Sequence, residues 1–135
     1  MASKFDCKIV TPEEMIYDSQ VELVSAPGLE GDYGFMNSAA PYVSVLRMGT
    51  MTVHEDEHDQ GRQFAIAGGY VEADGDKVVV LAAQALDTST IDRDACNQEL
   101  TDCKDKLAAL AADDPKAAYY QRQSKWQEYL LSRLG

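Results

Sequence analysis

The sequence has few positive charges and no long hydrophobic run, and both absences limit what the protein can do. It carries 12 Lys and Arg against 23 Asp and Glu, a formal net charge of −11. Because nucleic acid is itself an anion, this balance argues against it as a partner. No apolar run approaches the ~20 residues of a bilayer-spanning helix, and the first residues lack the apolar core of a signal peptide. We therefore expect a protein that is neither secreted nor embedded in a membrane.

Cysteine is also scarce, with Cys7, Cys96 and Cys103 far apart in the chain. An odd, scattered set indicates free thiols in a reducing compartment. Cys96 and Cys103 are seven residues apart in an expected helix. Their Cα atoms would then lie about 10 Å apart, which is too far for a disulfide.

The 45% of hydrophobic residues suffice for a folded core, and 135 residues fit one domain or one domain with an appendage. The segment 27–49 is broken by four glycines and two prolines, with short apolar pieces at 33–35 and 42–45. Gly28, Gly31 and Gly34 are predicted to form tight bends. This pattern is typical of short strands joined by chain reversals.

Alternation of apolar and polar residues predicts further strands on both sides of that segment. They are expected at residues 4–10, 21–25, 48–53, 63–67, 70–73 and 77–83. Residues 54–62 form a polar loop, and Asp74-Gly75 is a hairpin turn signal. The run 78–81 is apolar throughout and is predicted to be buried on both faces. We predict an antiparallel β-sandwich or barrel of eight to ten short strands over residues 1–88.

After residue 88 the periodicity becomes helical. Ser89 and Asp92 resemble a capping pair, and Asp114-Pro115 begins a second helix after a break. The first helix has an apolar stripe at Cys96, Leu100, Cys103, Leu107 and Leu110, and the second at Tyr119, Trp126, Leu130 and Leu134. Residues 89–135 are therefore predicted to form a C-terminal antiparallel α-helical hairpin. Its stripes are thin, so we expect it to be weakly held.

Charge is distributed unevenly, with a net −10 in residues 1–90, −4 in 91–114 and +3 in 115–135. The bases of the last segment are Lys116, Arg122, Lys125 and Arg133. Two interpretations stay open: these side chains lie against the protein's own acidic surface, or they contact an acidic partner.

Several blocks, in this order and spacing, carry a family resemblance. They are Gly31-Asp32-Tyr33-Gly34-Phe35, Ala40-Pro41, Ala67-Gly68-Gly69-Tyr70-Val71-Glu72, Val78-Val79-Val80-Leu81-Ala82 and Ile91-Asp92. With them the chain resembles the epsilon subunit of the bacterial F-type ATP synthase over nearly its whole length.

The resemblance implies a rotor subunit without catalytic activity. Its sandwich would contact the gamma subunit and the c-ring, at the cytoplasmic face of the cell membrane. Its helical hairpin would lie folded on the sandwich or extend toward the alpha and beta subunits and inhibit ATP hydrolysis. Lys116, Arg122, Lys125 and Arg133 would then meet an acidic segment of the beta subunit.

The same resemblance places the c-ring contact at Glu30, Asp32, Asn37 and Ser38. Carboxylates suit this contact, because the facing loop of the c subunits in the family carries a basic residue. The chain departs from the family at residues 37–39, where Pro-Gly-His is usual. The alternative is that Glu30 and Asp32 are solvated turn residues.

Some members of the family bind ATP at the base of the hairpin, which makes a nucleotide-sensing module a second hypothesis. Ile91 and Asp92 match their motif, and Arg122 could face such a site. Ala95, Cys96 and Ala83 replace its arginine, alanine and glutamate. The losses remove the cationic partner of a phosphate, so we expect no cofactor, with ATP at most a regulatory ligand.

His54 and His58 match the His-Glu-x-x-His pattern of zinc proteases, a third hypothesis. The pattern binds zinc on a helix, where positions four apart share a face. Here it lies in a polar loop, and no third histidine exists to complete the site. We expect no metal.

Overall fold

The structure is a computed structural model that describes residues 3–37, 39–56 and 58–134. The chain divides into two compact units, Met1–Asp87 and Thr88–Gly135. The predicted boundary follows residue 88, one residue later than the observed one.

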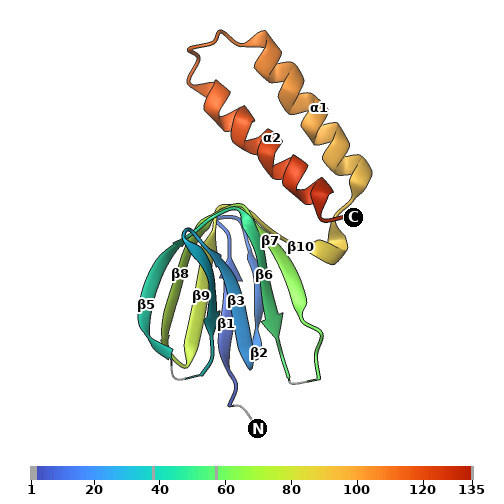
Figure 1. Cartoon of the computed structure of the whole chain (residues 1–135). Coiled ribbons are helices and arrows are strands. Elements are labelled where there is room, and N and C mark those ends of the chain that lie inside the picture. The colour runs from blue at the N-terminus through green and yellow to red at the C-terminus, as the bar shows by residue number, and fades with distance from the viewer. Residues whose placement is uncertain (1–2, 38, 57, 135) are drawn as a thin grey trace. The chain divides into compact units, whose positions relative to one another are not determined.

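The first unit is built from strands alone (Figure 1). They are β1 (Phe5–Val10), β2 (Met15–Val21), β3 (Leu23–Gly28), β4 (Gly31–Phe35), β5 (Ala39–Leu46), β6 (Gly49–His54), β7 (Arg62–Ile66), β8 (Gly69–Gly75), β9 (Lys77–Ala82) and β10 (Ala85–Asp87). Their order in the sheet is β10-β7-β6-β3-β5-β8-β9-β1-β2, with β4 paired to β3. The predicted β-sandwich is confirmed, with ten strands in the described part of the chain.

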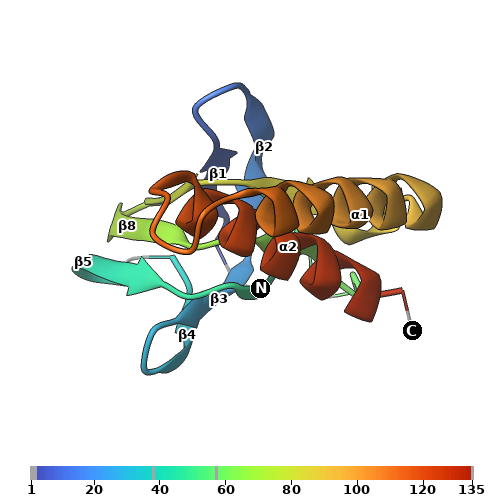
Figure 2. The same ribbon diagram turned by 90° about the horizontal axis from the view of Figure 1, so that it is seen from above.

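The continuous sheet folds over on itself to enclose its core. The change of layer falls between β3 and β5, which share only the pair Gly28 and Leu46. The strands β7 and β2 lie near opposite ends of the sheet order, yet Phe64 of β7 and Tyr17 of β2 meet with ring centroids 5.1 Å apart. This contact joins the two layers. Seen from above, β2 and β4 lie on opposite sides of the sandwich (Figure 2).

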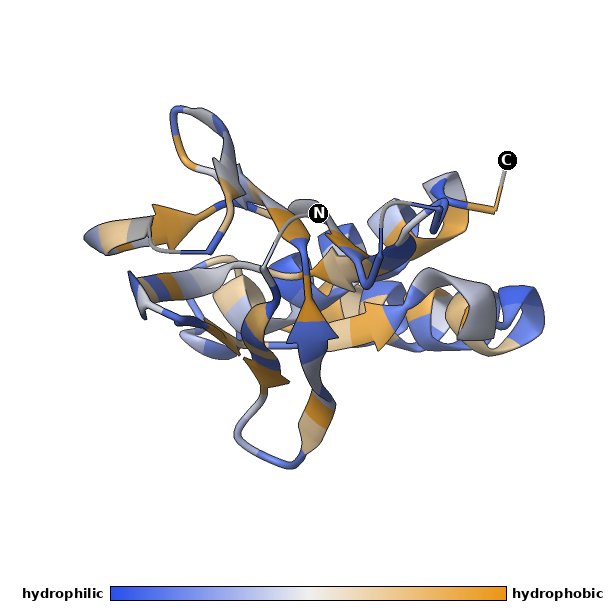
Figure 3. Cartoon of the chain, turned by 90° about the horizontal axis from the view of Figure 1, so that it is seen from below, coloured by the Kyte–Doolittle hydropathy of each residue, from blue (hydrophilic) through white to orange (hydrophobic). Residues whose placement is uncertain are grey.

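The core draws on both layers through the alternation that a strand imposes on its side chains. Along β1, Phe5, Cys7 and Ile9 are at most 1% exposed, and the residues between them are half-buried. The same change of hydropathy from one residue to the next is visible along the strands in Figure 3.

All three cysteines are free thiols, as predicted. Burial raises the pKa of Cys7 to about 12, which keeps its thiol protonated and unreactive.

Two predictions about the sheet were wrong. First, β1 and β9 pair in parallel, from Asp6 with Lys77 to Val10 with Leu81, although every strand was expected to be antiparallel. No hairpin joins these strands, so no turn fixes their relative direction. Second, β2 and β10 were missed, since neither has a clear apolar alternation.

The run 78–81 was predicted to be buried on both faces, and this is also wrong. Val78 and Val80 are buried, but Leu81 is 43% exposed and Val79 is half-buried. One face of β9 therefore lies in the core, whereas the apolar side chains of its other face, Val79 and Leu81, are partly exposed.

The second unit is an antiparallel pair of helices, α1 (Arg93–Ala109) and α2 (Lys116–Ser132), after a 3-10 turn at Thr88–Thr90 (Figure 1). The first helix is capped by Asp92, whose carboxylate accepts hydrogen bonds from the amides of Asp94 and Ala95. Ser89 lies in the 3-10 turn, so its predicted capping role was wrong. Asp114 accepts from the amide of Lys116 at 2.9 Å, as its predicted role requires.

Few side chains of the two helices are buried. They are Cys96, Cys103, Ser124, Trp126 and Leu130. Tyr119 was predicted in this stripe but is 51% exposed, since the helical turn directs it outward beside Tyr120. The buried hydroxyl of Ser124 has no hydrogen-bond partner among residues 3–37, 39–56 and 58–134.

Candidate partner-binding surfaces

A two-residue turn, Leu29-Glu30, forms the tip of the β3–β4 hairpin, where Gly28 pairs with Gly31. A Cβ atom at Gly28 would lie 2.0 Å from the Tyr33 ring, so only glycine fits there. Gly31 has a φ of +147°, which other residues rarely adopt. Both predicted bends are confirmed, whereas Gly34 lies inside β4 opposite Ser25.

The tip places the predicted carboxylates in solvent. Leu29 is 64% exposed and Glu30 is exposed beside it. The carboxylate of Asp32 forms an ion pair with the guanidinium of Arg47 at 2.9 Å, and the Asp32 side chain remains 62% exposed. An exposed pair of this kind contributes about 1 kcal/mol or less, so it can exchange for a partner's charge. Asn37 lies in the turn after β4, and Ser38 is outside the described residues.

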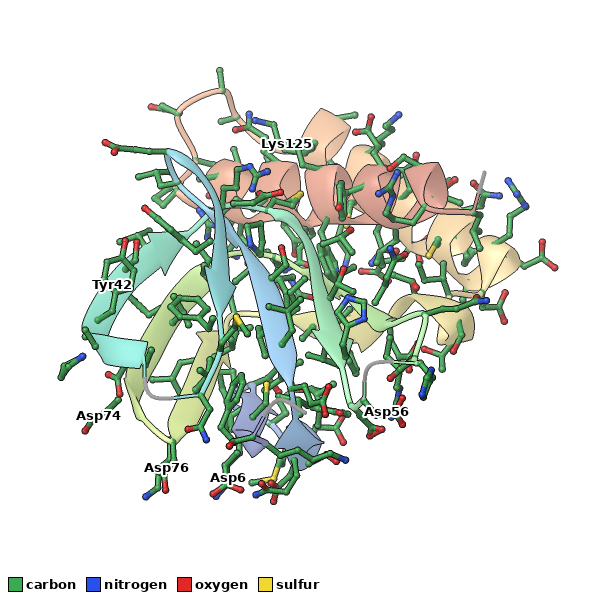
Figure 4. The ribbon with its side chains drawn as sticks, turned by 60° about the horizontal axis from the view of Figure 1, so that its bottom comes forward. Asp6, Tyr42, Asp56, Asp74, Asp76 and Lys125 are labelled. Carbon is green, nitrogen blue, oxygen red and sulfur yellow. The ribbon has the colours of Figure 1, made fainter. Side chains whose placement is uncertain are left out.

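Beside this tip, three aromatic rings from β4 and β5 form a cluster that sequence reasoning missed. Tyr33 and Tyr42 meet edge to face with centroids 5.3 Å apart, and Phe35 lies 6.0 Å from Tyr42. The interaction between the two phenol groups lowers the pKa of Tyr33 and raises that of Tyr42. Tyr33 and Phe35 belong to β4 and Tyr42 to β5, so the spacing within one strand does not reveal the cluster (Figure 4, Tyr42 labelled).

A second missed feature is an apolar row across β5, β8 and β9. Register pairs Val45 with Tyr70 and Tyr70 with Leu81, and the three side chains are 44%, 54% and 43% exposed. We call these three residues the apolar row. It borders a cavity of about 450 Å³ lined by Val10, Thr11, Pro12, Gly69, Tyr70, Leu81, Ala82 and Ala83. Contiguous exposed apolar side chains of this kind mark interaction surfaces.

The four predicted bases of the hairpin are all exposed, and none forms an ion pair in the described part of the chain. At about 100° per residue, Arg122, Lys125 and Arg133 fall within roughly 80° of arc, whereas Lys116 points about 100–180° away from each of them. Arg133 also lies over the Tyr129 ring, 5.7 Å from its centroid. We call Arg122, Lys125 and Arg133 the basic face of α2; Figure 4 labels Lys125.

The residues proposed for a nucleotide do not meet. Ile91 is buried, and Asp92 uses its carboxylate to cap α1. Arg122 lies in the second turn of α2, near the connection between the helices, whereas Asp92 is at the far end of α1. From the helical rise their separation along the axis is about 15 Å.

In the His-Glu-x-x-His loop, the described side chains are used for internal hydrogen bonds. The carboxylate of Glu55 accepts from Tyr17 at 3.2 Å and from Ser19 at 3.3 Å. His54 Nδ1 lies 3.3 Å from the carbonyl oxygen of Asp59. Glu57 is outside the described residues. No group of three metal-ligating side chains is found over residues 3–37, 39–56 and 58–134.

Comparison with known proteins identifies the family of the strand-built unit. Residues 4–88 match the family described as the beta-sandwich domain of the ATP synthase delta/epsilon chain. The ATP synthase epsilon chain of Rhodospirillum rubrum is 31% identical over 135 residues, 100% of both chains. That of Maricaulis maris is 32% identical over 116 residues, 86% of each chain.

Solved structures share the fold. A chain in the Euglena gracilis mitochondrial ATP synthase, a structure of OSCP, F1 and c-ring, superposes with a TM-score of 0.74 at 18% identity, covering 100% of this chain and 84% of that one. A chain of the Tetrahymena thermophila mitochondrial ATP synthase central stalk and c-ring gives 0.58 at 16% identity, covering 96% and 94%.

The class of protein is a β-sandwich followed by a two-helix hairpin, with exposed apolar and charged surfaces. Sequence identity over whole chains then settles the family. The chain belongs to the epsilon chains of F-type ATP synthase. A search of the described helices finds none with the length and hydrophobicity needed to cross a membrane.

Proposed function

We propose that the chain is a non-catalytic rotor subunit of an F-type ATP synthase, which couples proton flow to ATP synthesis. Its partners are the gamma subunit, the c-ring and the alpha and beta subunits, and it is peripheral to the cytoplasmic face of the cell membrane. The observation that carries the proposal is the apolar row. A subunit attached to a rotating shaft needs a surface that binds its partner through non-covalent contacts and catalyses no reaction.

The apolar row is the proposed contact with the gamma subunit. Val45, Tyr70 and Leu81 lie on three adjacent strands, so the backbone holds them in place before binding. Side chains fixed in this way lose little conformational entropy when a partner covers them. The adjoining cavity of about 450 Å³ can receive an apolar side chain of that partner.

Binding to purified gamma subunit tests the proposal with two leucines of similar exposure. Leu81 is 43% exposed in the row, and Leu23 of β3 is 37% exposed outside it. We expect Leu81→Asp to weaken binding by at least about 30-fold, since a carboxylate loses its water at the interface. Leu23→Asp is expected to bind like the wild type. Equal affinities for the two variants would contradict this surface, and a wild-type chain that does not bind would contradict the function.

Inhibition of ATP hydrolysis by the C-terminal helices is the second part of the proposal. The exposed basic face of α2 on an acidic chain supports it, since these bases can reach an acidic segment of the beta subunit. The separation of Arg122 from Asp92 supports an inhibitor that acts without a bound nucleotide. A regulatory role for ATP would need the hairpin to rearrange so that these two residues meet.

A further inference from the structure

We propose that Arg62 and Asp87 form a clamp that fixes the end of β10 to the sandwich, so that the hinge of the helical hairpin is limited to the residues after Asp87. The ring of Tyr17 holds Arg62 in position. We call Tyr17, Arg62 and Asp87 the hinge clamp. Its effect on inhibition of ATP hydrolysis rests on the proposed function, but its effect on β10 does not.

The strand β10 is the last element of the sandwich before the hairpin, and backbone pairing holds it weakly. It has three residues and pairs among the described strands with β7, ending at Asp87 opposite Phe64 (Figure 1). It stands at one end of the sheet order, and all of its residues are only half-buried. A short edge strand opens more easily than a strand in the middle of a sheet. A side-chain contact at its end can therefore decide whether it stays paired.

Arg62 makes that contact from the neighbouring strand. It is the first residue of β7 and lies two positions before Phe64, the register partner of Asp87. Side chains two positions apart share a face of a strand, so Arg62 is the diagonal neighbour of Asp87. Its Nη2 atom lies 2.8 Å from Oδ2 of Asp87. The ion pair thus ties the two strands together beyond their last backbone pair.

Aromatic rings hold the guanidinium of Arg62 in place. Its Cζ atom lies 5.2 Å from the ring centroid of Tyr17 and 5.3 Å from that of Phe64. Tyr17 belongs to β2, at the opposite end of the sheet order from β10, so the hinge clamp joins the two edge strands of the sheet. The hydroxyl of Tyr17 donates in turn to the Glu55 carboxylate at 3.2 Å. A planar guanidinium restrained by rings loses less conformational freedom when it forms its ion pair.

A second ion pair of the sandwich provides a comparison. Arg47 and Asp32 lie 2.9 Å apart, and the Asp32 side chain is 62% exposed. The Asp87 side chain is only 20% exposed. A carboxylate in contact with less water interacts more strongly with its cation, because the local dielectric constant is lower. The pair in the hinge clamp is therefore expected to contribute more than the pair at the β3–β4 hairpin.

The hinge clamp sets the length of the segment between the two units. With the ion pair formed, this segment begins after Asp87 and ends at Asp92, the cap of α1. If β10 separated from β7, the three residues of β10 would be added to the segment. A connection longer than the distance that it must span lowers the effective concentration of the tethered part at its target. The hinge clamp therefore favours binding of the hairpin to a partner.

Hydrogen exchange of the full chain tests the hinge clamp directly. Asp87→Asn removes the charge and keeps the shape of the side chain. We expect it to raise the exchange rate of the β10 amides about fivefold, the upper range for a half-exposed ion pair. The β1 and β9 amides should exchange as in the wild type, which shows that the sandwich stays folded. Asp32→Asn, which breaks the other ion pair, is the matched control and should leave exchange in β10 unchanged.

A double-mutant cycle separates the ion pair from the other contacts of its two members. Arg62→Gln should also raise the exchange rate of the β10 amides. The double variant should exchange more slowly than the product of the two single effects predicts, because either change alone already breaks the pair. Single effects that simply multiply would overturn the inference, as would unchanged exchange in Asp87→Asn.

Hydrolysis of ATP by the assembled enzyme separates the hinge clamp from the proposed function. If Asp87→Asn raises exchange in β10 and weakens inhibition several-fold relative to the wild type, both stand. If exchange in β10 rises and inhibition is unchanged, the ion pair does not control the hinge, and the inference is wrong. If the wild-type chain does not inhibit, the proposed regulation fails, while hydrogen exchange and the double-mutant cycle still decide whether Arg62 and Asp87 hold β10.

Discussion

The two units of this chain are stabilised in different ways. The sandwich buries large side chains from almost every strand, and Phe5, Phe64 and Ile9 are among those below 2% exposed. The helices α1 and α2 bury five residues, and one of them is a serine whose hydroxyl has no hydrogen-bond partner in the described part of the chain. Burial of an aliphatic or aromatic side chain contributes about 1.5–3 kcal/mol, so the two units differ in stability as well as in fold. A rigid anchor and a marginally stable arm are what the proposed function requires, with one unit for binding and the other for regulation.

The largest expected effect is the loss of stability when a core side chain of either unit is truncated. Phe64→Ala should destabilise the sandwich by about 3–5 kcal/mol, because it removes a ring at the centre of the core and leaves a cavity. Leu130→Ala should destabilise the hairpin by about 2 kcal/mol, since a thin two-helix interface can collapse around the loss. Trp126 is the chain's single tryptophan and lies in the hairpin, so its fluorescence reports that unit. Hydrogen exchange of β1 and β9 amides reports the other.

We expect each substitution to shift the signal of its own unit. If each variant destabilised both units equally, as measured by Trp126 fluorescence and by hydrogen exchange of β1 and β9, the units would unfold as one. The contrast between the two units would then be wrong.

A smaller effect is expected when the basic face of α2 is neutralised. Replacing Arg122, Lys125 and Arg133 by alanine should reduce inhibition of ATP hydrolysis several-fold at low salt and less at 0.5 M salt, where charges are screened within about 5 Å. Lys116→Ala is the matched control, because that side chain points away from the face. Hydrolysis by the assembled enzyme with each variant, at several ionic strengths, gives the measurement. Inhibition that is unchanged at every salt concentration would remove the electrostatic account.

How far the sequence predicts the molecule depends on the range of the contacts. Phe5, Cys7 and Ile9 were assigned to one buried face from alternation alone, and all three are buried. Asp114 was assigned its capping role from its position before Pro115, and it makes the bond. Such features follow from neighbours in the chain.

Features that join distant segments were missed. The outward face of Leu81 depends on which strands cover β9, and the apolar row exists only once Val45, Tyr70 and Leu81 are in register. Likewise, Tyr33 and Tyr42 meet only because the fold brings β4 and β5 together, and the local sequence does not specify that arrangement. The candidate surfaces are therefore products of sheet topology, which explains why local patterns located the carboxylates of the tip but not the rings beside them.

The smallest expected effect concerns Ser124, the buried polar residue of the hairpin, at 6% exposure. Its hydroxyl has lost water and has no partner in the described residues, and an unpaired buried polar group costs about 1–3 kcal/mol. Ser124→Ala should therefore stabilise the hairpin by about 1 kcal/mol, measured as the midpoint of the Trp126 fluorescence transition in urea. Ser132→Ala is the control, because that hydroxyl is exposed and bonds to the carbonyl of Tyr129.

A destabilised Ser124→Ala variant would mean that the hydroxyl is bonded in solution. If instead the hairpin gains stability and inhibits less well, the buried serine keeps the arm weak enough to move, and the contrast between anchor and arm is part of how the subunit works.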